Sequence, residues 1–294
     1  MPELPDVEVY VEKVAELAAG HVLTRLDLLN PFLLRTVEPR PAEFAGKRLE
    51  ATRRIGKRVV LEFEDELFAV LHLMIAGRLR WLAPGRKPPA RIALATFEFD
   101  HGLLIFTEAG SKRRASLHLV RGQPAVAGFD PGGIEIQQAT LDAFSARLTH
   151  ENHTLKRALT DPHSFAGIGN AYSDEILFRA RLSPLALTRN LADEEIARLF
   201  AACREVLAEW TERLREQTGA ALPENVTAFR PEMAVHGKFG QPCPVCGAPV
   251  QRIVYAENET NYCARCQTGG RLLADRSLSR LLHASWPKSI DELG

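Results

Sequence analysis

Four cysteines carry the most specific chemical pattern in this sequence. They form two C-x-x-C pairs with sixteen residues between the pairs: Cys243, Cys246, Cys263 and Cys266. Each pair lets two thiolates face one ion, and two such pairs on a β-hairpin give the closed tetrahedral site of structural zinc. Redox-active or disulfide-bonded pairs are the alternatives. We predict one structural Zn²⁺ at these four residues, whereas Cys203, in helical sequence, is predicted to be a small core residue.

The extreme N-terminus, MPELPDVEVY, places a proline directly behind the initiator methionine and a glutamate after it. Proline at this position is ordinarily without chemical meaning. It becomes a nucleophile only if Met1 is removed and the nitrogen of Pro2 is left as a free secondary amine. This stretch alone does not decide between the two interpretations.

A glycine-containing turn, FAGIGNAYSDEILF at 165–178, forms a second candidate site. Gly167 and Gly169 flank Ile168, and Asn170 opens the helical stretch that follows. Backbone N–H groups at a helix N-terminus suit a phosphate oxygen, and the Asn170 side chain adds a donor. The alternative is a packing joint between two helices, in which the glycines only permit positive φ.

Basic residues gather in two short segments. In RRIGKRVVLEF (53–63), strand alternation directs Lys57 to one face, from which it could reach a polyanion. A second run, KRR at 112–114, contains Arg113 and Arg114. The alternative for both segments is a solvated surface, with the lysine stem lying along apolar neighbours.

A third segment, LHLMIAGRLRW at 71–81, contains one histidine and an apolar strand end. His72 is either a phosphate contact or a core histidine whose hydrogen bonds are satisfied. Ile75 is either a core residue or an apolar wedge. Isolated from other features, both residues fit the core better.

The composition limits the classes of function. Lysine plus arginine and aspartate plus glutamate each number 37, so the formal net charge is zero and the pI is about 7.1. A generic nucleic-acid binder is basic, so any such function must rest on positive charge gathered on one surface. No apolar run approaches the roughly 18 residues of a membrane span, and the acidic N-terminus is unlike a targeting peptide. We predict a cytoplasmic protein.

The elements that must position these residues show two sequence patterns, helical spacing and strand-like alternation. Residues 5–19 show helical spacing, with Pro5 suited to the start and Gly20 to the stop. Between 22 and 120, short alternating runs predict the strands of a sandwich or barrel. Glycine and proline accumulate at 122–133 and mark a domain boundary, beyond which the pattern is helical up to an irregular stretch before the cysteines.

Together these segments resemble one known family over nearly the whole chain. The motifs are PELPDVE, GKRVVLEF, HLMIAGRLR, GIGNAYSDEILFRARLSP and the hairpin VHGKFGQPCPVCG…YCARCQ. They occur in the order found in the formamidopyrimidine-DNA glycosylase and endonuclease VIII family of base-excision repair enzymes. PELP at the terminus, followed by GIGN and a zinc hairpin, makes the resemblance specific.

The resemblance implies an α+β multidomain fold. An N-terminal β-sandwich would carry an N-terminal helix, and a helical helix-two-turn-helix domain would carry a zinc hairpin, with DNA in a cleft between them. The expected boundaries are 1–130 for the catalytic β-sandwich domain, 131–235 for the helix-two-turn-helix DNA-binding domain, 236–270 for the zinc finger and 271–294 for a C-terminal tail. Only the cleft then needs to be basic, which a neutral net charge permits.

The resemblance also implies a reaction. In this family the methionine is removed and the proline nitrogen attacks C1′ of the damaged nucleotide, so Pro2 would be the nucleophile and Glu3 the general acid/base. Lys57 matches the residue that holds a phosphate near the lesion and assists elimination. An N-terminal amine has a pKa of about 7.7–8, against about 10.4 for lysine, so part of it is unprotonated at neutral pH.

Further residues match positions that contact DNA. His72 and Asn170 match positions that bind the phosphate backbone of the DNA. Ile75 aligns with the methionine that fills the hole left by the flipped base. Arg113 or Arg114 would take the place of the arginine that contacts the orphaned base.

The sequence departs from the family where lesion choice is decided. Asn258 aligns with a zinc-hairpin arginine that contacts phosphate and serves the second elimination, and EAGSKRRAS replaces the DPRRFG loop of the purine-specific branch. Asp6 stands where glutamate is usual, and the segment 218–235 is shorter. We therefore predict weak or altered 8-oxoguanine activity, a preference for oxidised pyrimidines or formamidopyrimidines, and a lyase that largely stalls after β-elimination.

The predicted function is that of a bifunctional DNA glycosylase/AP lyase with one Zn²⁺. It would act as a monomer on double-stranded DNA containing damaged bases or abasic sites, in the cytoplasm and, in a bacterium, at the nucleoid. The alternative from another class is a non-catalytic damaged-DNA-binding protein of the same fold, in which Pro2 and Glu3 are expendable. An RNA-binding role, in which PELP has no purpose, is a third reading.

Overall fold

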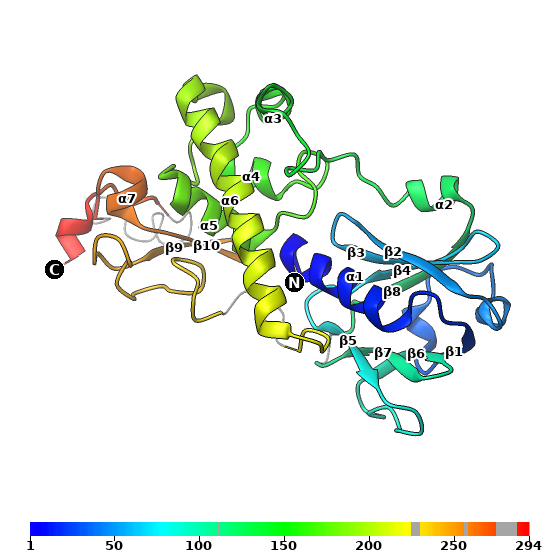
Figure 1. Ribbon diagram of the computed structural model, residues 1–294. Helices are drawn as coiled ribbons and strands as arrows, with labels where there is room; N and C mark the ends of the chain where they lie inside the picture. Colours follow the sequence, from blue (N-terminus) through cyan, green and yellow to red (C-terminus); the bar gives the residue numbers. More distant parts are fainter. Residues whose placement is uncertain (111, 225–229, 256–257, 275–286, 294) are drawn as a thin grey trace. The chain divides into compact units, whose positions relative to one another are not determined.

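The described residues of the computed structural model (Figure 1) are 1–110, 112–224, 230–255, 258–274 and 287–293. The chain forms two compact units, each built from two separate segments. We call Met1–Pro131 with Glu209–Thr227 the sandwich unit, and Gly132–Ala208 with Ala228–Gly294 the helical unit. The four-part division expected from the sequence stays a prediction.

The sandwich unit contains two four-stranded antiparallel sheets. One has the strand order β1-β6-β7-β5 and the other β2-β3-β4-β8. The strands are β1 (Leu23–Leu28), β2 (Leu49–Ile55), β3 (Arg58–Phe63), β4 (Leu67–His72), β5 (Gly77–Leu82), β6 (Ala93–Phe99), β7 (Gly102–Glu108) and β8 (Ser116–Arg121). The predicted β-sandwich is therefore confirmed.

Strands β3 and β4 are buried almost throughout because apolar side chains cover both faces of their sheet. Val59 and Leu71, which pair across the two strands, belong to the main core of the unit. Val60 points to the opposite face and packs with Val126 of the short helix α2 (Gln123–Ala127). Burial on both faces explains why these strands read as nearly continuous apolar runs.

Helix α1 (Leu4–Ala18) lies against β2 and β3, and it matches the predicted helix at 5–19 to within one residue at each end. Its side chains Val7 and Tyr10 are fully buried. The Tyr10 hydroxyl donates to the carbonyl oxygen of Pro223 at 2.8 Å. This bond joins the helix to the second chain segment of the sandwich unit.

The helical unit confirms the second half of the predicted fold class. Its elements are α3 (Leu141–Thr149), α4 (Leu155–Thr160), α5 (Asn170–Ala180), the hairpin strands β9 (Gln251–Tyr255) and β10 (Asn258–Tyr262), and α7 (Ala264–Thr268). The long helix α6 (Asp193–Thr218) begins in this unit and ends in the sandwich unit. Short 3-10 turns lie at Thr188–Asn190 and Ile290–Leu293 in this unit, and at Pro31–Leu33 and Pro41–Phe44 in the sandwich unit. Among the described residues, no helix has the length and apolar character to cross a membrane.

Candidate functional site

The N-terminal segment of the sandwich unit forms the first part of the site. Pro2 and Glu3 are buried, with Glu3 only 4% exposed, and Glu3 immediately precedes the first turn of α1. The Glu3 N–H donates to Oδ2 of Asp6 at 3.0 Å. A carboxylate in the first turn satisfies an N–H that the helix leaves unpaired, and it favours the positive end of the helix dipole. The aspartate that departs from the family pattern therefore anchors the start of α1.

The terminal amine of the chain lies among both carboxylates and cations. Burial lowers the pKa of the Met1 amino group below its ordinary value of 8.0, with Arg78 and Lys57 acting in the same direction. Glu3 and Asp6 act in the opposite direction and do not outweigh burial. The Met1 amine is thus more largely unprotonated at neutral pH than an exposed N-terminal amine.

Lys57 lies in a turn, which corrects the expectation that it projects from a strand. Strand β2 ends at Ile55 and β3 begins at Arg58, and these two residues pair, so that Gly56 and Lys57 form a two-residue hairpin loop. Gly56 has φ +56°, a conformation that hairpin turns require and glycine readily adopts. The alternation argument was wrong because it carried the strand through this glycine.

The arginines beside Lys57 are largely paired within the sandwich unit. Nε of Arg54 donates to Oε2 of Glu8 at 2.8 Å, and Arg54 is only 11% exposed. Arg53 forms an ion pair with Glu62. The positive charge that this segment can offer to a polyanion is therefore smaller than its sequence suggests.

His72 ends β4, where it pairs with Arg58 on one side and Ser116 on the other. Burial, followed by the charges of Arg58 and Lys57, lowers its pKa to about 4. The ring is therefore neutral at pH 7 and can donate only one hydrogen bond.

We expect the protein to lose stability as the pH falls from 6.5 toward 4, partly through His72. The folded-state pKa of about 4 lies below the ordinary value of 6.5, so the unfolded chain binds a proton in this interval that the folded chain does not. The contribution of His72 to the free energy of unfolding should therefore be lower at pH 4 than above pH 6.5, by up to about 3 kcal/mol. Urea unfolding of wild type and His72→Gln at several pH values measures it, with the exposed His150→Gln as control. Equal pH dependence in wild type and His72→Gln would contradict the expectation.

The turn between β4 and β5 presents an apolar side chain to solvent. Ile75 is 58% exposed, so the interpretation of this residue as core is wrong. Met74 before it has φ +52°, and the Arg78 guanidinium donates to the carbonyl oxygen of Gly77 at 2.7 Å. A Cβ on Gly77 would lie 2.2 Å from the carbonyl oxygen of Leu73. The turn therefore has a fixed shape with Ile75 at its tip.

The loop between β7 and β8 carries the two candidate arginines in different environments. The buried carboxylate of Glu108 accepts the N–H groups of Arg114 (3.0 Å) and Ala115 (3.2 Å). The Arg113 guanidinium donates to the carbonyl oxygen of Arg91 at 2.8 Å. Among the described residues the structure gives the Arg114 side chain no hydrogen-bond partner, and both arginines are exposed. Sequence reasoning missed Glu108, although an acidic residue at the end of a buried strand is a signal for such an anchor.

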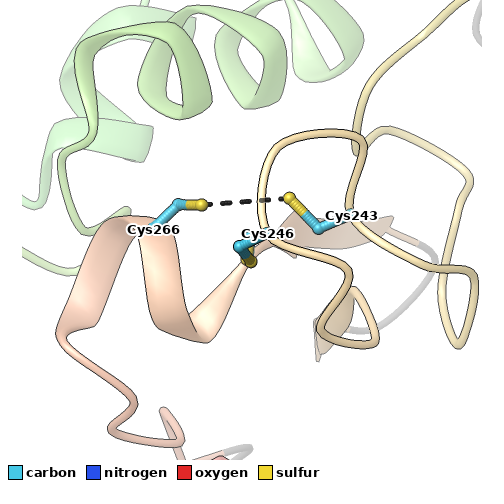
Figure 2. Close-up of side chains that lie close together, drawn as sticks. Cys243, Cys246 and Cys266 are labelled. Atoms are coloured by element: carbon cyan, nitrogen blue, oxygen red, sulfur yellow. Dashed lines mark hydrogen bonds between the residues drawn. The ribbon is translucent and has the colours of Figure 1, made fainter.

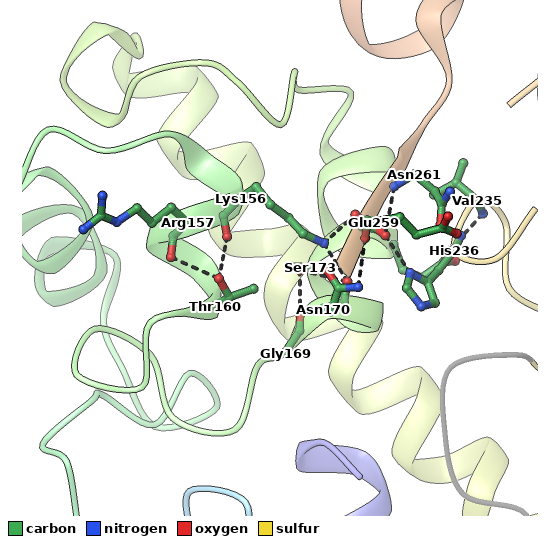
Figure 3. A network of polar contacts seen from close by, with 12 residues as sticks. Lys156, Arg157, Thr160, Gly169, Asn170, Ser173, Val235, His236, Glu259 and Asn261 are labelled. Atoms are coloured by element: carbon green, nitrogen blue, oxygen red, sulfur yellow. Dashed lines mark hydrogen bonds and ion pairs between the residues drawn. The ribbon is translucent and has the colours of Figure 1, made fainter. Parts of the chain in front are cut away.

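In the helical unit, Asn170 is the first residue of α5 and follows Gly169 at the helix cap. Its side-chain Nδ2 donates to the carbonyl oxygen of Glu259 on β10 at 2.9 Å (Figure 3). The predicted phosphate donor therefore also joins the GIGN turn to the zinc hairpin. One N–H of the amide group is used in this bond and a second is left for another acceptor.

Two buried carboxylates on α5 extend this connection. Asp174 is fully buried and accepts from Lys156 Nζ at 2.5 Å, from the backbone N–H of Asn261 at 3.1 Å, and lies 2.6 Å from His236 Nδ1. Lys156 Nζ also donates to the carbonyl oxygen of Asn170 at 2.6 Å (Figure 3). Buried charges need such partners. The network fixes the GIGN turn against β10.

Glu175, the next residue, holds the chain that leads into the cysteines. Its carboxylate accepts the backbone N–H groups of Ala234, Val235 and His236 at 2.8–2.9 Å. Burial raises the pKa of Glu175 above its ordinary value. Sequence reasoning missed this pair of carboxylates, and the available signal was two consecutive acids inside the apolar stretch AYSDEILF.

The four predicted zinc ligands converge in the helical unit. Figure 2 shows three of them, Cys243, Cys246 and Cys266. The Sγ atoms of Cys243 and Cys266 are 3.9 Å apart, those of Cys246 and Cys263 are 3.4 Å apart, and all four lie within 4.8 Å of one another. Zn–S bonds of about 2.3 Å in a tetrahedron place sulfurs about 3.8 Å apart, which these distances fit. The zinc would be structural, because four thiolates leave no open coordination position.

Asn258 begins β10 opposite Tyr255 of β9. The side chain of Asn258 lies outside the described part of the structure. Its predicted place at a phosphate therefore stays a prediction.

Comparison with protein-family models gives three consecutive matches. The formamidopyrimidine-DNA glycosylase N-terminal domain matches residues 1–114, and the formamidopyrimidine-DNA glycosylase H2TH domain matches residues 128–220. The zinc finger found in FPG and IleRS matches residues 240–269. The third match contains all four clustered cysteines, so the chain has one structural zinc site.

Relatives and solved structures match over nearly the full length. The formamidopyrimidine-DNA glycosylase of Thermus thermophilus is 35% identical over 283 residues, which is 92% of this chain and 100% of that protein. The enzyme of the same name from Chloroflexus aurantiacus is 32% identical over 284 residues, 91% and 98% of the two chains. Lactococcus lactis Fpg in complex with abasic-site DNA has a TM-score of 0.81 at 26% identity, covering 90% and 99%. The same protein with N7-benzyl-Fapy-dG DNA has a TM-score of 0.82 at 26% identity, covering 91% and 100%.

Proposed function

The chain belongs to the formamidopyrimidine-DNA glycosylase family and is a DNA glycosylase of base-excision repair, and from that premise we propose that it is bifunctional. It would remove an oxidised base through a Schiff base on Pro2 and then cleave the strand as an AP lyase. The observation that carries this proposal is the buried start of α1, where Pro2 and Glu3 are both buried and where Lys57 and Arg78 act with burial to lower the pKa of the Met1 amine beside them. That is the environment an amine nucleophile needs.

The proposed reaction begins after removal of Met1. The lone pair of the Pro2 nitrogen attacks C1′ of the flipped nucleotide, the glycosidic bond breaks, and the departing base takes up the proton that the Pro2 nitrogen loses. The bond from C1′ to the ring oxygen then breaks as the Glu3 carboxyl group protonates that oxygen, which leaves an iminium ion at C1′. Loss of a C2′ proton and departure of the 3′ phosphate follow, and water releases the product and restores the amine. Lys57, in the hairpin turn, would hold the phosphate near the lesion.

Residues outside this centre would hold and deform the duplex. We assign the wedge to Ile75, because it is exposed at the tip of a fixed turn. Arg114 is a better candidate than Arg113 for the orphaned base, since the Arg113 guanidinium already donates to Arg91. His72 would donate to a phosphate as a neutral ring, and Asn170 through its second N–H.

We also propose that the protein acts as a monomer on damaged or abasic double-stranded DNA in the cytoplasm. Each function proposed above uses residues of a single chain. The zinc ion would serve the hairpin only, and no step of the reaction passes through it.

We expect altered lesion choice and an elimination that stops early. Excision of 8-oxoguanine opposite cytosine should be slower than excision of a formamidopyrimidine or an oxidised pyrimidine by about tenfold or more.

Because Asn258 carries no charge, the main product should be the β-elimination product, and Asn258→Arg should increase the 3′-phosphate product. Denaturing gels of single-lesion duplexes measure both. Fast 8-oxoguanine excision would contradict the first expectation, and mainly 3′-phosphate product from wild type would contradict the second.

A further inference from the structure

Three metal-ligand side chains of the sandwich unit converge at a place that the proposed reaction does not use. Nδ1 of His21 lies 3.1 Å from Oδ1 of Asp100, and Nδ1 of His101 lies 2.7 Å from the same oxygen. All three atoms lie within 4.8 Å of one another. We propose that this cluster is a second metal site, which binds one divalent transition ion such as Zn²⁺ through two imidazoles and one carboxylate.

The donor set and its spacing suit such an ion. Imidazole nitrogen and carboxylate oxygen bind zinc at about 2.0–2.2 Å. In a tetrahedron two ligands at that distance are about 3.4 Å apart, so the 2.7 and 3.1 Å separations found here need to widen by only about 0.3–0.7 Å to hold an ion. Imidazole ligands favour zinc, copper or nickel over magnesium or calcium, so the site would select a transition ion.

The tautomer of His101 directs a lone pair into the cluster. Its Nε2 lies 2.6 Å from the carbonyl oxygen of Leu17, which can only accept, so Nε2 carries a proton. In a neutral ring the lone pair then belongs to Nδ1, which faces the Asp100 carboxylate. Two acceptors this close require a cation or a second proton between them. A ligand histidine that donates its other N–H to a backbone carbonyl is the usual arrangement at protein metal sites.

The backbone holds all three ligands before an ion arrives. Asp100 and His101 are the two central residues of the hairpin between β6 and β7, where Phe99 pairs with Gly102. The Trp81 ring packs so closely on that hairpin that a Cβ on Gly102 would lie 2.2 Å from it. The Trp81 and His101 rings are 5.3 Å apart.

His21 is fixed from the other side of the cluster. Its N–H donates to the carbonyl oxygen of Ala18 at 3.1 Å, and its own carbonyl accepts from Leu49 at 2.9 Å. Ligands on such rigid backbone lose little freedom on binding.

The surroundings of the cluster favour a bound cation. The His21 and His101 ring centroids are only 3.7 Å apart, so both rings can face one ion. Leu17 lies in the last turn of α1, and the negative end of a helix dipole attracts a cation. The His21, Asp100 and His101 side chains are 42%, 63% and 38% exposed, so water can complete the coordination.

Calorimetric titration with Zn²⁺ tests the proposal on the full-length protein, after one equivalent has been loaded at the four cysteines. Wild type should bind one further equivalent. His21→Gln and His101→Gln each remove a direct ligand. Each should therefore lower the affinity for this second Zn²⁺ by more than the 10–100-fold that is typical when a ligand loses only its outer hydrogen-bond partner. The exposed His150→Gln should bind like wild type. Nitrogen NMR of the rings should show Nδ1 of both histidines shifting while Nε2 of His101 stays protonated.

Two results would overturn the proposal. One is the absence of a second equivalent in wild type up to millimolar free Zn²⁺, which would leave a carboxylate paired with protonated histidine. The other is a second equivalent that persists in both histidine variants. Asp100→Asn provides a further ligand variant, and thermal unfolding without added metal verifies that each variant is folded. Because the readouts are binding and spectra, failure here would leave the proposed glycosylase function intact.

Discussion

Borohydride should trap a covalent complex between the wild-type protein and a duplex with one abasic site, and Pro2→Gly should lose that complex or form it about a hundredfold more slowly or worse. The secondary amine of Pro2 gives an iminium ion that is charged without further protonation. Glycine supplies a primary amine on a freely rotating backbone, in place of the ring that the structure buries at the start of α1. Glu3→Gln keeps the shape of the buried side chain but cannot transfer a proton, which should slow trapping by about 10²–10⁴-fold.

Matched controls separate chemistry from binding in this experiment. Glu50→Gln makes the same substitution at an exposed position of the sandwich unit and should trap like wild type. Mass spectrometry of each protein verifies that Met1 has been removed. If wild type binds the duplex tightly and yields no trapped complex, the non-catalytic damaged-DNA-binding protein becomes the better account of this chain.

The second large effect should come from loss of the zinc ion. Cys263→Ala removes a fully buried ligand, and structural zinc supplies about 10–16 kcal/mol of apparent binding free energy in zinc-finger peptides. Loss of the ion should release β10, whose Glu259 carbonyl and Asn261 N–H hold Asn170 and Asp174. We therefore expect no bound zinc at this site and at least a hundredfold loss of affinity for abasic duplex.

Metal analysis and duplex binding measure this prediction, with Cys203→Ala as the control. Cys203 is also fully buried but lies on α6, apart from the cluster, so its variant should retain the zinc ion and DNA affinity. Strong burial raises the pKa of Cys203, so it remains a thiol and does not compete for metal. A Cys263→Ala protein that binds abasic DNA like wild type would show that the hairpin does not depend on the ion.

The features that were predictable from the sequence are those that depend on the spacing of residues close together in the chain. Helix α1 follows from apolar periodicity between Pro5 and Gly20, and the zinc site from the two C-x-x-C pairs. Lys57 was misplaced because alternation was continued through Gly56, which has positive φ and ends the strand. A glycine inside an apparent strand was the available signal.

Features that depend on partners far along the chain were not predictable. Asp174 and Glu175 appear in sequence as polar residues on an amphipathic helix, and their acceptance of N–H groups from Asn261 and Val235 exists only in the fold. The pairing of Arg54 with Glu8 likewise removes a charge that composition assigns to a basic surface. Such contacts are decided by packing, which spacing rules do not describe.

The return of the chain into the sandwich unit has a consequence for the order of synthesis. Leu222 belongs to the main core of that unit, Pro223 accepts from Tyr10, and Arg215 donates to Glu12 at 2.9 Å. A ribosome moving at about 5–20 residues per second needs roughly 5–20 s to pass from the end of β8 to Leu222. During that time Tyr10 and Glu12 of α1 lack their partners Pro223 and Arg215. The sandwich unit can therefore complete its packing only late in translation.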